Sequence, residues 1–544
     1  MDLGELGGDE PHFEDDDDGD EEDDGEFDKR PRKRQRRAGE RNVALQHIKT
    51  IVIISICLQN TNERCNCLQG WMGFFMKSTG VPEKVIEVMA HAGLSVSLST
   101  IYNMVTSISK EISHKLDEPE TIQRIPIHKT NQIPCRSMNI KQSTTDGNVE
   151  VLENLFHQGG IGDKSEVNFD AEHDVDMTEH VILVHGDLLT KERVDSVRNS
   201  RKIEHTPKNR LQYVVFLPGL FHYKMACADA LWRTYIHPKE GREDENSLYQ
   251  HIGILRPDET GKMVSKPGFR RVHDVVHHDI WASMLDCWRL EAESRNTEWS
   301  TLERFATSKP VWEDIINMSR VIVKKFIATT QDLDAAREQP PLQRDKRFEN
   351  QTLRNRDELL YVDLCQAMNT GDIGRVEASF LPWIHMFKAT GKHKYASQMS
   401  RFLTNLQFNY PAALSNIVRM NLLCNPTGKP FAFRAVDWVV ERNNLYTKVI
   451  FRGGGPNGTL DHIIKESPLI EVYRNCHVTM ENAFHLQHRT IRHAAPDMTK
   501  TIQKLAARIK QKNPHTKKEG RRSGGCTDGG GGVSKVNNAV ESFV

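Results

Sequence analysis

The pattern of apolar and polar positions is clearest between residues 181 and 235, where it predicts two strands and two helices. Two short apolar runs, at 181–184 and 213–217, are each followed within two residues by a Gly. Such runs are typical of strands that are buried on both faces in the middle of an α/β sheet. The first run leads through His185 into Gly186 and Asp187, so we expect Asp187 at the carboxyl end of its strand.

Each run is followed by a segment with the periodicity of a helix. Residues 191–203 are compatible with a helix that has Thr190 as its N-cap and an outer face that is basic. The basic residues of this outer face are Lys191, Arg193, Arg198, Arg201 and Lys202. Residues 221–235 place Phe221, Met225, Ala228 and Trp232 on one helical stripe. His222, Asp229 and Arg233 lie beside that stripe and form either one wall of a site or a solvated flank.

The rest of the pattern is mostly helical. Residues 42–115 predict helices at 83–91, with Val85, Val88 and Met89 on one face, and at 99–112. Two helices about a turn with a Gly form either a DNA-reading helix-turn-helix or a plain helical hairpin. We expect a linker at 116–180 with one short helix at 148–157, a helical region at 238–450 and a C-terminal block at 451–500.

Charge divides the chain in a way that the overall composition conceals. The formal net charge of the 544 residues is −1, but residues 1–28 contain sixteen acidic and no basic side chains. The remaining residues carry all 73 basic but only 58 acidic side chains, a net charge of +15. A basic body favours a polyanionic partner, and the acidic arm either screens this surface or occupies it. We expect disorder at 1–41 and 501–544, which are dominated by charged residues or Gly.

A dense basic cluster follows the acidic arm. It predicts a nuclear localisation signal, and therefore a nuclear protein with a nuclear import receptor as a partner; the alternatives are a nucleic-acid patch or a solubilising tail. Its residues are Lys29, Arg30, Arg32, Lys33, Arg34, Arg36 and Arg37. No apolar run reaches the roughly 20 residues that span a membrane, so we expect no membrane partner. The sequence leaves the oligomeric state open.

Acidic residues at two distant places are candidates for catalysis and for metal binding. Asp187 follows a strand, where α/β folds place ligands, although an Asp there also serves as a turn residue that caps the next segment. Asp437 and Glu441, in a helix predicted at 433–447, are four residues apart and project from one face of that helix. The alternative is that this face is only a solvated acidic surface. Glu441 is the first candidate for a helical acid and Asp437 the second. Asp187 and Glu441 are the candidate ligands of Mg²⁺ or Mn²⁺, because hard oxygen ligands hold the ions that assist phosphoryl transfer.

Two further groups of residues bear on binding. His273, His277 and His278 lie near Asp274 and Asp279 and raise the question of zinc, but they lack both a Cys pair and the His-Glu-x-x-His spacing. In the C-terminal block, His485, His488, Arg489, Arg492 and His493 recur every three to four residues and form a basic face suited to a phosphate backbone. The candidate nucleic-acid contacts are Arg193, Arg198, Arg201, Lys202, Arg489 and Arg492.

Three groups of residues carry a resemblance to a known family. They are Gly186 to Thr190, the segment Phe221 to Met225 with Ala228 to Trp232, and the block at 421–493. They resemble an uncharacterised fungal family called domain of unknown function 6589, and the resemblance covers most of 55–500. That family is repetitive and looks transposon-derived, with a layout similar to ribonuclease-H-like transposases of the Asp-Asp-Glu type. The resemblance implies an α/β core (ribonuclease-H-like) with a large helical insertion and a helical N-terminal region.

The sequence departs from this family between Lys115 and Arg136. Most members carry there a strand with an aromatic-Asp-Asn motif, which supplies the natural first catalytic acid, and nothing in this stretch matches it. We therefore expect a nuclear, transposon-derived protein that binds nucleic acid with an incomplete set of catalytic acids. The alternatives are a helical interaction or scaffold protein that never touches DNA, and an active metal-dependent transposase or nuclease.

Overall fold

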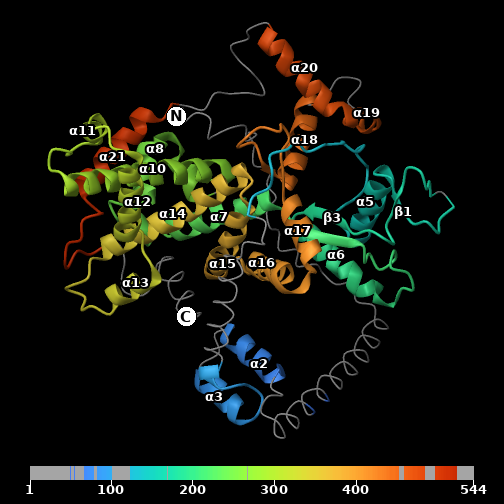
Figure 1. Cartoon of the computed structure of the whole chain (residues 1–544), viewed down its shortest axis with the longest axis horizontal. Coiled ribbons are helices and arrows are strands. Elements are labelled where there is room, and N and C mark those ends of the chain that lie inside the picture. Colours follow the sequence, from blue (N-terminus) through green and yellow to red (C-terminus); the bar gives the residue numbers. More distant parts are fainter. Residues whose placement is uncertain are drawn as a thin grey trace. The chain divides into compact units, whose positions relative to one another are not determined.

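The computed structural model is mostly helical, and its described residues fall into two compact units, one within 50–100 and one within 123–523 (Figure 1). The residues that the structure describes are 50, 54, 67–78, 83–100, 123–167, 169–265, 267–451, 459–483 and 497–523. The acidic arm, the basic cluster at 29–37 and residues 524–544 lie outside this set. Among the described helices, none has both the length and the apolar character that a membrane span requires.

The smaller unit contains a pair of helices, α2 (Cys67–Ser78) and α3 (Glu83–His91). The predicted helix at 83–91 is confirmed, and its predicted apolar face is right for Met89 but wrong for Val85 and Val88. Ile86 packs against Met76 and Val96 with Met89 beside them, while Val85 and Val88 are exposed. Both sets of positions satisfy helical spacing, and contact with the neighbouring helix decides which of them is buried. Most of the predicted helix at 99–112 lies outside the described residues.

In the larger unit, β3 (Ile182–Gly186) and β4 (Val214–Pro218) form a parallel pair, as the two apolar runs predicted. α6 (Leu188–Ser200) connects them, and α5 (Thr145–Gln158) packs against α6. Contrary to the prediction for both strands, β3 is only partly buried along its whole length. In the described part of the chain β4 is the one strand that pairs with β3, so the sheet is too narrow to cover it fully.

The segment predicted as a linker contributes to the larger unit. Residues 123–140 form no helix or strand, and the backbone amides of Ile125 and Thr130 donate to the carbonyls of Gly371 and Asn425, each at 2.8 Å. β1 (Ile161–Gly162) and β2 (Val175–Asp176) then form a short parallel pair beside α5. Polar composition led to the linker prediction, whereas backbone hydrogen bonding to distant segments fixes this stretch.

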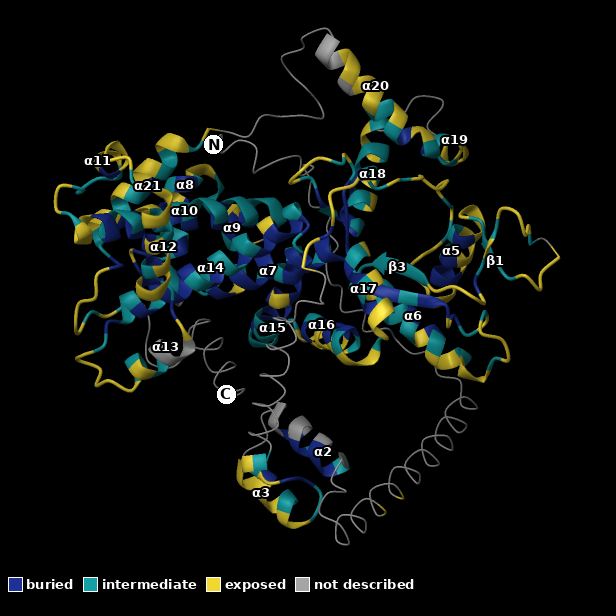
Figure 2. Ribbon diagram, viewed as in Figure 1, coloured by how far each residue is buried: buried dark blue, intermediate teal, exposed yellow. Residues whose placement is uncertain are grey.

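The helical region predicted at 238–450 is confirmed. Its core is formed by α7, α10, α14 and α15, where the aromatic rings of Tyr223, Phe380 and Phe387 meet edge to face. Figure 2 shows buried residues gathered along α7 and α14, whereas α20 is largely exposed. The elements that follow β4 are α7 (Leu220–Tyr235), α8 (Leu248–Leu255), α9 (Thr260–Ser265), α10 (Phe269–Arg295), α11 (Leu302–Thr307), α12 (Trp312–Phe326), α13 (Thr330–Arg337), α14 (Lys346–Thr370), α15 (Ile373–Ala389), α16 (His393–Thr404), α17 (Ala412–Asn421), β5 (Leu423–Cys424), β6 (Arg434–Ala435), α18 (Val436–Phe451), α19 (Leu460–Glu466), α20 (Ile470–Ala483) and α21 (Thr499–Lys512).

The prediction of disorder from residue 501 is wrong for 501–523. α21 packs against α8 and α10 and buries Leu505 and Ile509 completely. Beyond it, the buried His515 ring shares a 2.8 Å hydrogen bond with Asp286 of α10. An apolar stripe at i, i+3, i+4 and i+7 runs through this Lys-rich segment, formed by Ile502, Leu505, Ala506 and Ile509. The stripe is the signal that composition obscured.

Candidate functional site

A cavity of about 460 Å³ opens at the edge of the sheet where β3 and β4 end. Its wall includes Gly186, the last residue of β3, with Asp187 directly after it, and Gly219 and His222 after β4. Side chains of α6 and α16 complete it, among them Lys191, Asp195, Arg198, Tyr395, Arg401 and Phe402. The carboxyl ends of parallel strands meet at the same edge, and α/β folds bind ligands there.

Asp187 caps α6 and also lines this cavity. Its Oδ1 accepts a hydrogen bond from the backbone amide of Thr190 at 2.7 Å, so Asp187, and not Thr190, is the N-cap. An Asp at this position satisfies an amide that the first helical turn leaves without a partner. Within the described residues Oδ2 accepts no hydrogen bond, so one carboxylate oxygen of Asp187 remains for a ligand.

Asp437 caps a helix to which it does not belong. It lies in the first turn of α18, with 5% of its side chain exposed, and its carboxylate accepts hydrogen bonds at the start of α7. The donors are the backbone amides of Phe221 (3.0 and 3.1 Å) and His222 (3.0 Å) and Nδ1 of His222 (2.9 Å). Burial alone would raise the pKa of Asp437, but these hydrogen bonds and the charge of His222 hold it below its usual value.

Gly219 makes this approach possible. A Cβ atom at position 219 would lie 2.4 Å from Oδ2 of Asp437 and 3.0 Å from the carbonyl oxygen of Gly186. Any larger residue would therefore push the carboxylate away from the start of α7. The amide of Gly219 also donates to the carbonyl of Gly186 at 2.9 Å, which joins the ends of the two strands.

His222 is the centre of the acidic group. Its Nδ1 donates to Asp437, and its Nε2 lies 4.0 Å from Oε1 of Glu441, whose side chain is 36% exposed. Burial alone would lower the pKa of His222, but the hydrogen bond and charge of Asp437, together with the charges of Glu441 and Asp187, raise it above its usual value. The three acids named from the sequence thus come together around a histidine that favours its charged form.

This arrangement limits what the acids can hold. Both oxygens of Asp437 accept hydrogen bonds, so its carboxylate positions α7 and His222 and is not available as an outward-facing metal ligand. His222 occupies the space between Asp437 and Glu441. A pair of bridged metal ions needs several carboxylate oxygens directed at one point. The described geometry instead places the His222 ring between Asp437 and Glu441, and binding of Mg²⁺ or Mn²⁺ by Asp187 and Glu441 stays a prediction.

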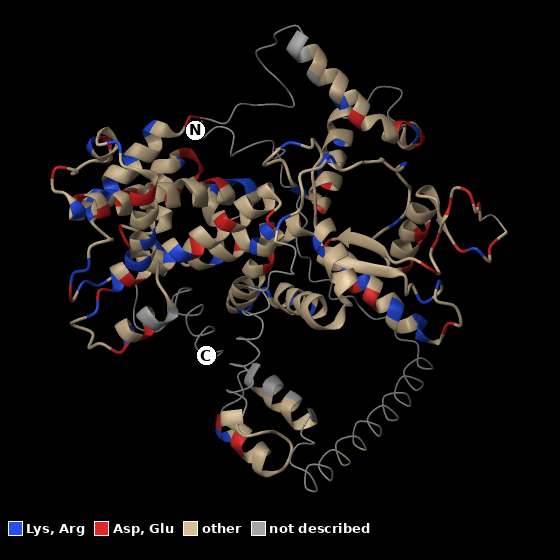
Figure 3. Ribbon diagram, in the orientation of Figure 1, with Lys and Arg blue, Asp and Glu red and all other residues tan. Residues whose placement is uncertain are grey.

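Basic side chains predominate along the cavity. Five of its lining residues are basic and two are acidic, Asp187 and Asp195. The basic residues are Lys191, Arg198, Lys202, Arg210 and Arg401. Lys191 pairs with Asp195 from the same helix, and Arg401 approaches Asp195 from α16 at 3.4 Å. Figure 3 shows basic and acidic residues side by side along α6. The cavity therefore carries a net positive charge and suits an anionic ligand.

The basic residues proposed from the sequence have different roles in the structure. Lys202 lines the cavity and is exposed. Arg198 also lines it, but its guanidinium donates to the carbonyls of Leu211 and Val214, and burial lowers its pKa. Two others lie away from the cavity lining: Arg193 donates to the carbonyl of Gln142 at 3.0 Å and Arg201 to that of Asn209 at 3.4 Å. Arg489 and Arg492 lie outside the described residues.

Sequence reasoning missed Arg401 and placed His222 correctly only as one of two alternatives. His222 forms a wall of the site, whereas Asp229 and Arg233 pair with each other at 2.7 Å and Asp229 also pairs with Lys392 at 2.6 Å. Arg401 comes from α16, far from the other lining residues in the sequence. Nothing in the local pattern around residue 401 indicates that α16 faces α6.

Comparison with known proteins identifies a family but no individual relative. A family model described as "Family of unknown function (DUF6589)" matches residues 85–493. The matched region includes the whole cavity lining and the acids around His222. No curated protein and no solved structure matches the chain.

Proposed function

We propose that this chain, which belongs to the family of unknown function DUF6589, binds nucleic acid through the cavity at the ends of β3 and β4. One observation carries the proposal: five basic side chains line a cavity whose wall contains only two acids, and the pKa of His222, which also lines it, is raised. Phosphate groups are the natural ligands of such a surface. When Lys and Arg neutralise the phosphates, the cations that were condensed on the nucleic acid are released, and this release favours binding.

The size and exposure of the cavity support a phosphate ligand. Its volume of about 460 Å³ lies within the range of small-molecule sites, which suits one nucleotide or the end of a strand. Arg401, with 64% of its side chain exposed, and the exposed Lys202 are positioned to reach a backbone that continues outside the cavity. Arg198 and Lys191 lie deeper and add positive charge.

We also propose that the core descends from a ribonuclease-H-like transposase and lacks the full catalytic set. The support is a parallel strand pair with Asp187 at its end and a helix, α18, that brings Asp437 and Glu441 to the same place. The segment 123–140, upstream of both strands, contains no Asp or Glu. Asp437 is committed to the start of α7, so Asp187 and Glu441 alone remain for metal ions.

Substitution of the exposed cavity residues should weaken DNA binding in a salt-dependent way. The full chain is titrated onto a duplex of arbitrary sequence and onto a single strand, by fluorescence anisotropy, between about 50 and 200 mM salt. Arg401→Ala and Lys202→Ala should each reduce the affinity by about five- to tenfold and the slope of log affinity against log salt by about 1, because each removes one phosphate contact.

Lys394→Ala is the matched control. Lys394 lies on the same helix as Arg401 and is exposed, but it pairs with Glu192 and is not part of the cavity wall. An equal loss of affinity in Lys394→Ala would show that only net charge matters and would remove the cavity from the proposal. Absence of DNA binding by the wild-type chain would favour a scaffold protein. Nicking of the DNA with Mn²⁺ that stops in Asp187→Ala would favour an active nuclease.

We further propose a nuclear location and recognition by a nuclear import receptor, on the basis of the basic cluster at 29–37. Replacing its seven Lys and Arg residues by Ala in a fluorescent fusion should shift the protein from the nucleus to the cytoplasm. The control replaces the three basic residues Lys517, Lys518 and Arg522 near the other end of the chain. Nuclear accumulation that survives loss of the 29–37 cluster would contradict this proposal.

A further inference from the structure

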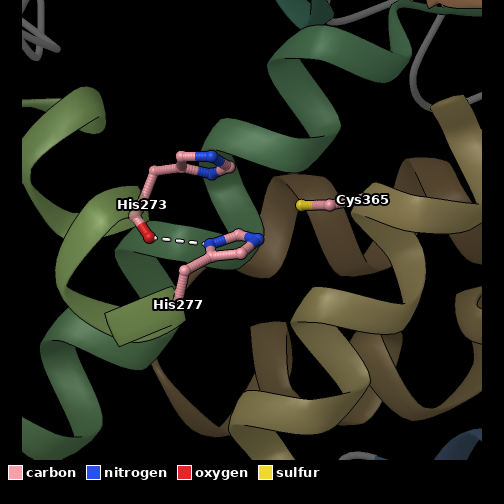
Figure 4. A group of neighbouring side chains, drawn as sticks. All are labelled: His273, His277 and Cys365. Carbon is pink, nitrogen blue, oxygen red and sulfur yellow. Dashed lines mark hydrogen bonds between the residues drawn. The ribbon is translucent and has the colours of Figure 1, made fainter. Parts of the chain in front are cut away.

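A second group of side chains lies in the helical core, away from the cavity. Figure 4 shows His273 and His277 of α10 directed toward the same space as Cys365 of α14. Their three potential ligand atoms lie within 4.8 Å of one another. We propose that these three residues bind a zinc ion, which joins α10 to α14 and leaves one coordination position for water or another ligand.

The two histidines form the part of the site that the helix itself preorganises. Residues four apart project from the same face of a helix, and a pair of His residues with this spacing is a recurrent zinc-binding arrangement. The rings of His273 and His277 are 4.2 Å apart between centroids. No backbone movement is therefore needed to bring both imidazoles to one ion.

Hydrogen bonds orient both imidazoles for coordination. Nδ1 of His277 lies 2.9 Å from the carbonyl oxygen of His273. Because a carbonyl only accepts, Nδ1 carries a proton, and coordination by this ring would be through Nε2. Nδ1 of His273 lies 2.9 Å from the hydroxyl oxygen of Tyr361, which can accept its proton, so coordination by this ring would be through Nε2. Metal-binding His residues characteristically donate their other ring proton to an oxygen in this way.

The donor set selects the metal. Two imidazole nitrogens and one thiolate suit zinc and are poor ligands for Mg²⁺ or Ca²⁺, which prefer oxygen. Bond lengths of about 2.0–2.1 Å to nitrogen and about 2.3 Å to sulfur place tetrahedral ligand atoms roughly 3.3–3.6 Å apart. The three side chains must therefore close by up to about 1 Å, which rotation of the Cys365 and His side chains supplies.

The three proposed ligands are buried to different extents, which leaves a side for entry of the ion and shields the bound ion. His273 and His277 are half-buried, so the ion enters from their side, whereas Cys365 is buried between the helices. Aromatic rings lie beside the two imidazoles: the centroid of Tyr361 is 5.8 Å from that of each imidazole, and the centroid of Phe269 is 5.6 Å from that of His273. Such surroundings exclude water from most of the coordination sphere. Binding converts the Cys365 thiol to a thiolate and releases its proton to solvent.

The experiment uses the reduced full chain after removal of metal with a chelator. Zinc is titrated in competition with a chromophoric chelator, and Co²⁺ serves as a spectroscopic probe, because a cobalt–thiolate bond produces a near-ultraviolet charge-transfer band. We expect one tightly bound zinc per chain and the thiolate band with Co²⁺. Cys365→Ser should abolish the band, and Cys365→Ser and His277→Ala should each weaken zinc binding by more than about 100-fold, a larger effect than the 10- to 100-fold loss typical of outer-shell partners.

Variants that leave the three ligands intact serve as controls. His278→Ala and Cys287→Ser remove a neighbouring imidazole and a buried thiol on α10 and should preserve affinity and band. Tyr361→Phe removes only the hydrogen-bond partner of His273 and should weaken zinc by about tenfold. Lack of the thiolate band in the wild-type chain overturns the proposal. So does zinc affinity that is unchanged in His277→Ala, which decides the question even if Cys365→Ser fails to fold.

Discussion

Replacing Leu505 and Ile509 together by Ala should lower the free energy of unfolding of the larger unit by about 4–10 kcal/mol, since each buried Leu or Ile contributes about 2–5 kcal/mol. Both side chains are fully buried where α21 packs against α8 and α10. Domains are stable by only about 5–15 kcal/mol, so the double variant should lose a large part of the stability of this unit. Denaturant titration followed by circular dichroism measures the loss.

Lys504→Ala is the control for this prediction. Lys504 is on the exposed face of α21, so its loss should change the free energy of unfolding by no more than about 0.5 kcal/mol. A double variant at 505 and 509 that is as stable as the wild-type chain would mean that α21 does not belong to the core. Single variants at the two positions should each show about half of the combined effect, provided that the two sites act independently.

Asp437→Ala should destabilise the protein by about 3–5 kcal/mol, the usual cost of removing one member of a buried, hydrogen-bonded charge pair. The change leaves two backbone amides at the start of α7 without an acceptor and leaves the His222 ring without its partner. Unpaired buried donors cost the full penalty of their desolvation. The free energy of unfolding, measured in denaturant at several pH values, reports the effect.

The loss in Asp437→Ala should depend on pH. The folded-state pKa of Asp437 is lowered, so its stabilising contribution is complete above the unfolded value of about 3.9 and disappears as pH falls through the folded value. The folded-state pKa of His222 is raised, so its contribution is complete below about 6.5 and disappears as pH rises through the folded value. The difference between wild type and variant should therefore be greatest between about pH 4 and 6.5.

Two companion variants separate the roles of charge and shape. Glu441→Ala changes a residue of the same helix that is only partly buried and lies 4.0 Å from His222, and it should cost less than about 1 kcal/mol. Asp437→Asn keeps one accepting oxygen and should lower the pKa of His222, observed by NMR titration of its ring protons. A pKa of His222 that is unchanged in Asp437→Asn would contradict the assignment of the raised pKa to this carboxylate.

The sequence was most informative where a local pattern determines structure. β3, β4 and the helix at 220–235 have the predicted positions within one or two residues. Asp187 is where a strand-end acid was expected, because strand and cap are both local features. In each of these segments the spacing of the apolar residues was sufficient to predict the type of element and the residues at which it begins and ends.

The sequence was least informative where a distant partner decides the outcome. α21 is Lys-rich, and only its contact with α10 reveals that its apolar stripe is a core element. Arg198 was predicted to face outward, but carbonyl groups after α6 accept its hydrogen bonds. Side chains of α16 form part of the cavity wall, and a carboxylate of α18 accepts the hydrogen bonds of the first amides of α7. Residue spacing within one segment contains no information about such partners.

The hydrogen bonds between Asp437 and the start of α7 also bear on the order in which the protein folds. The bonded residues are 216 positions apart, so α7 leaves the ribosome long before the carboxylate that completes its first turn. Contacts of such long sequence separation form late, because the intervening chain must first be ordered. The His222 site should therefore be among the last parts of the larger unit to mature during synthesis. Nascent chains that end before α18 should expose the amides of Phe221 and His222 to rapid hydrogen exchange.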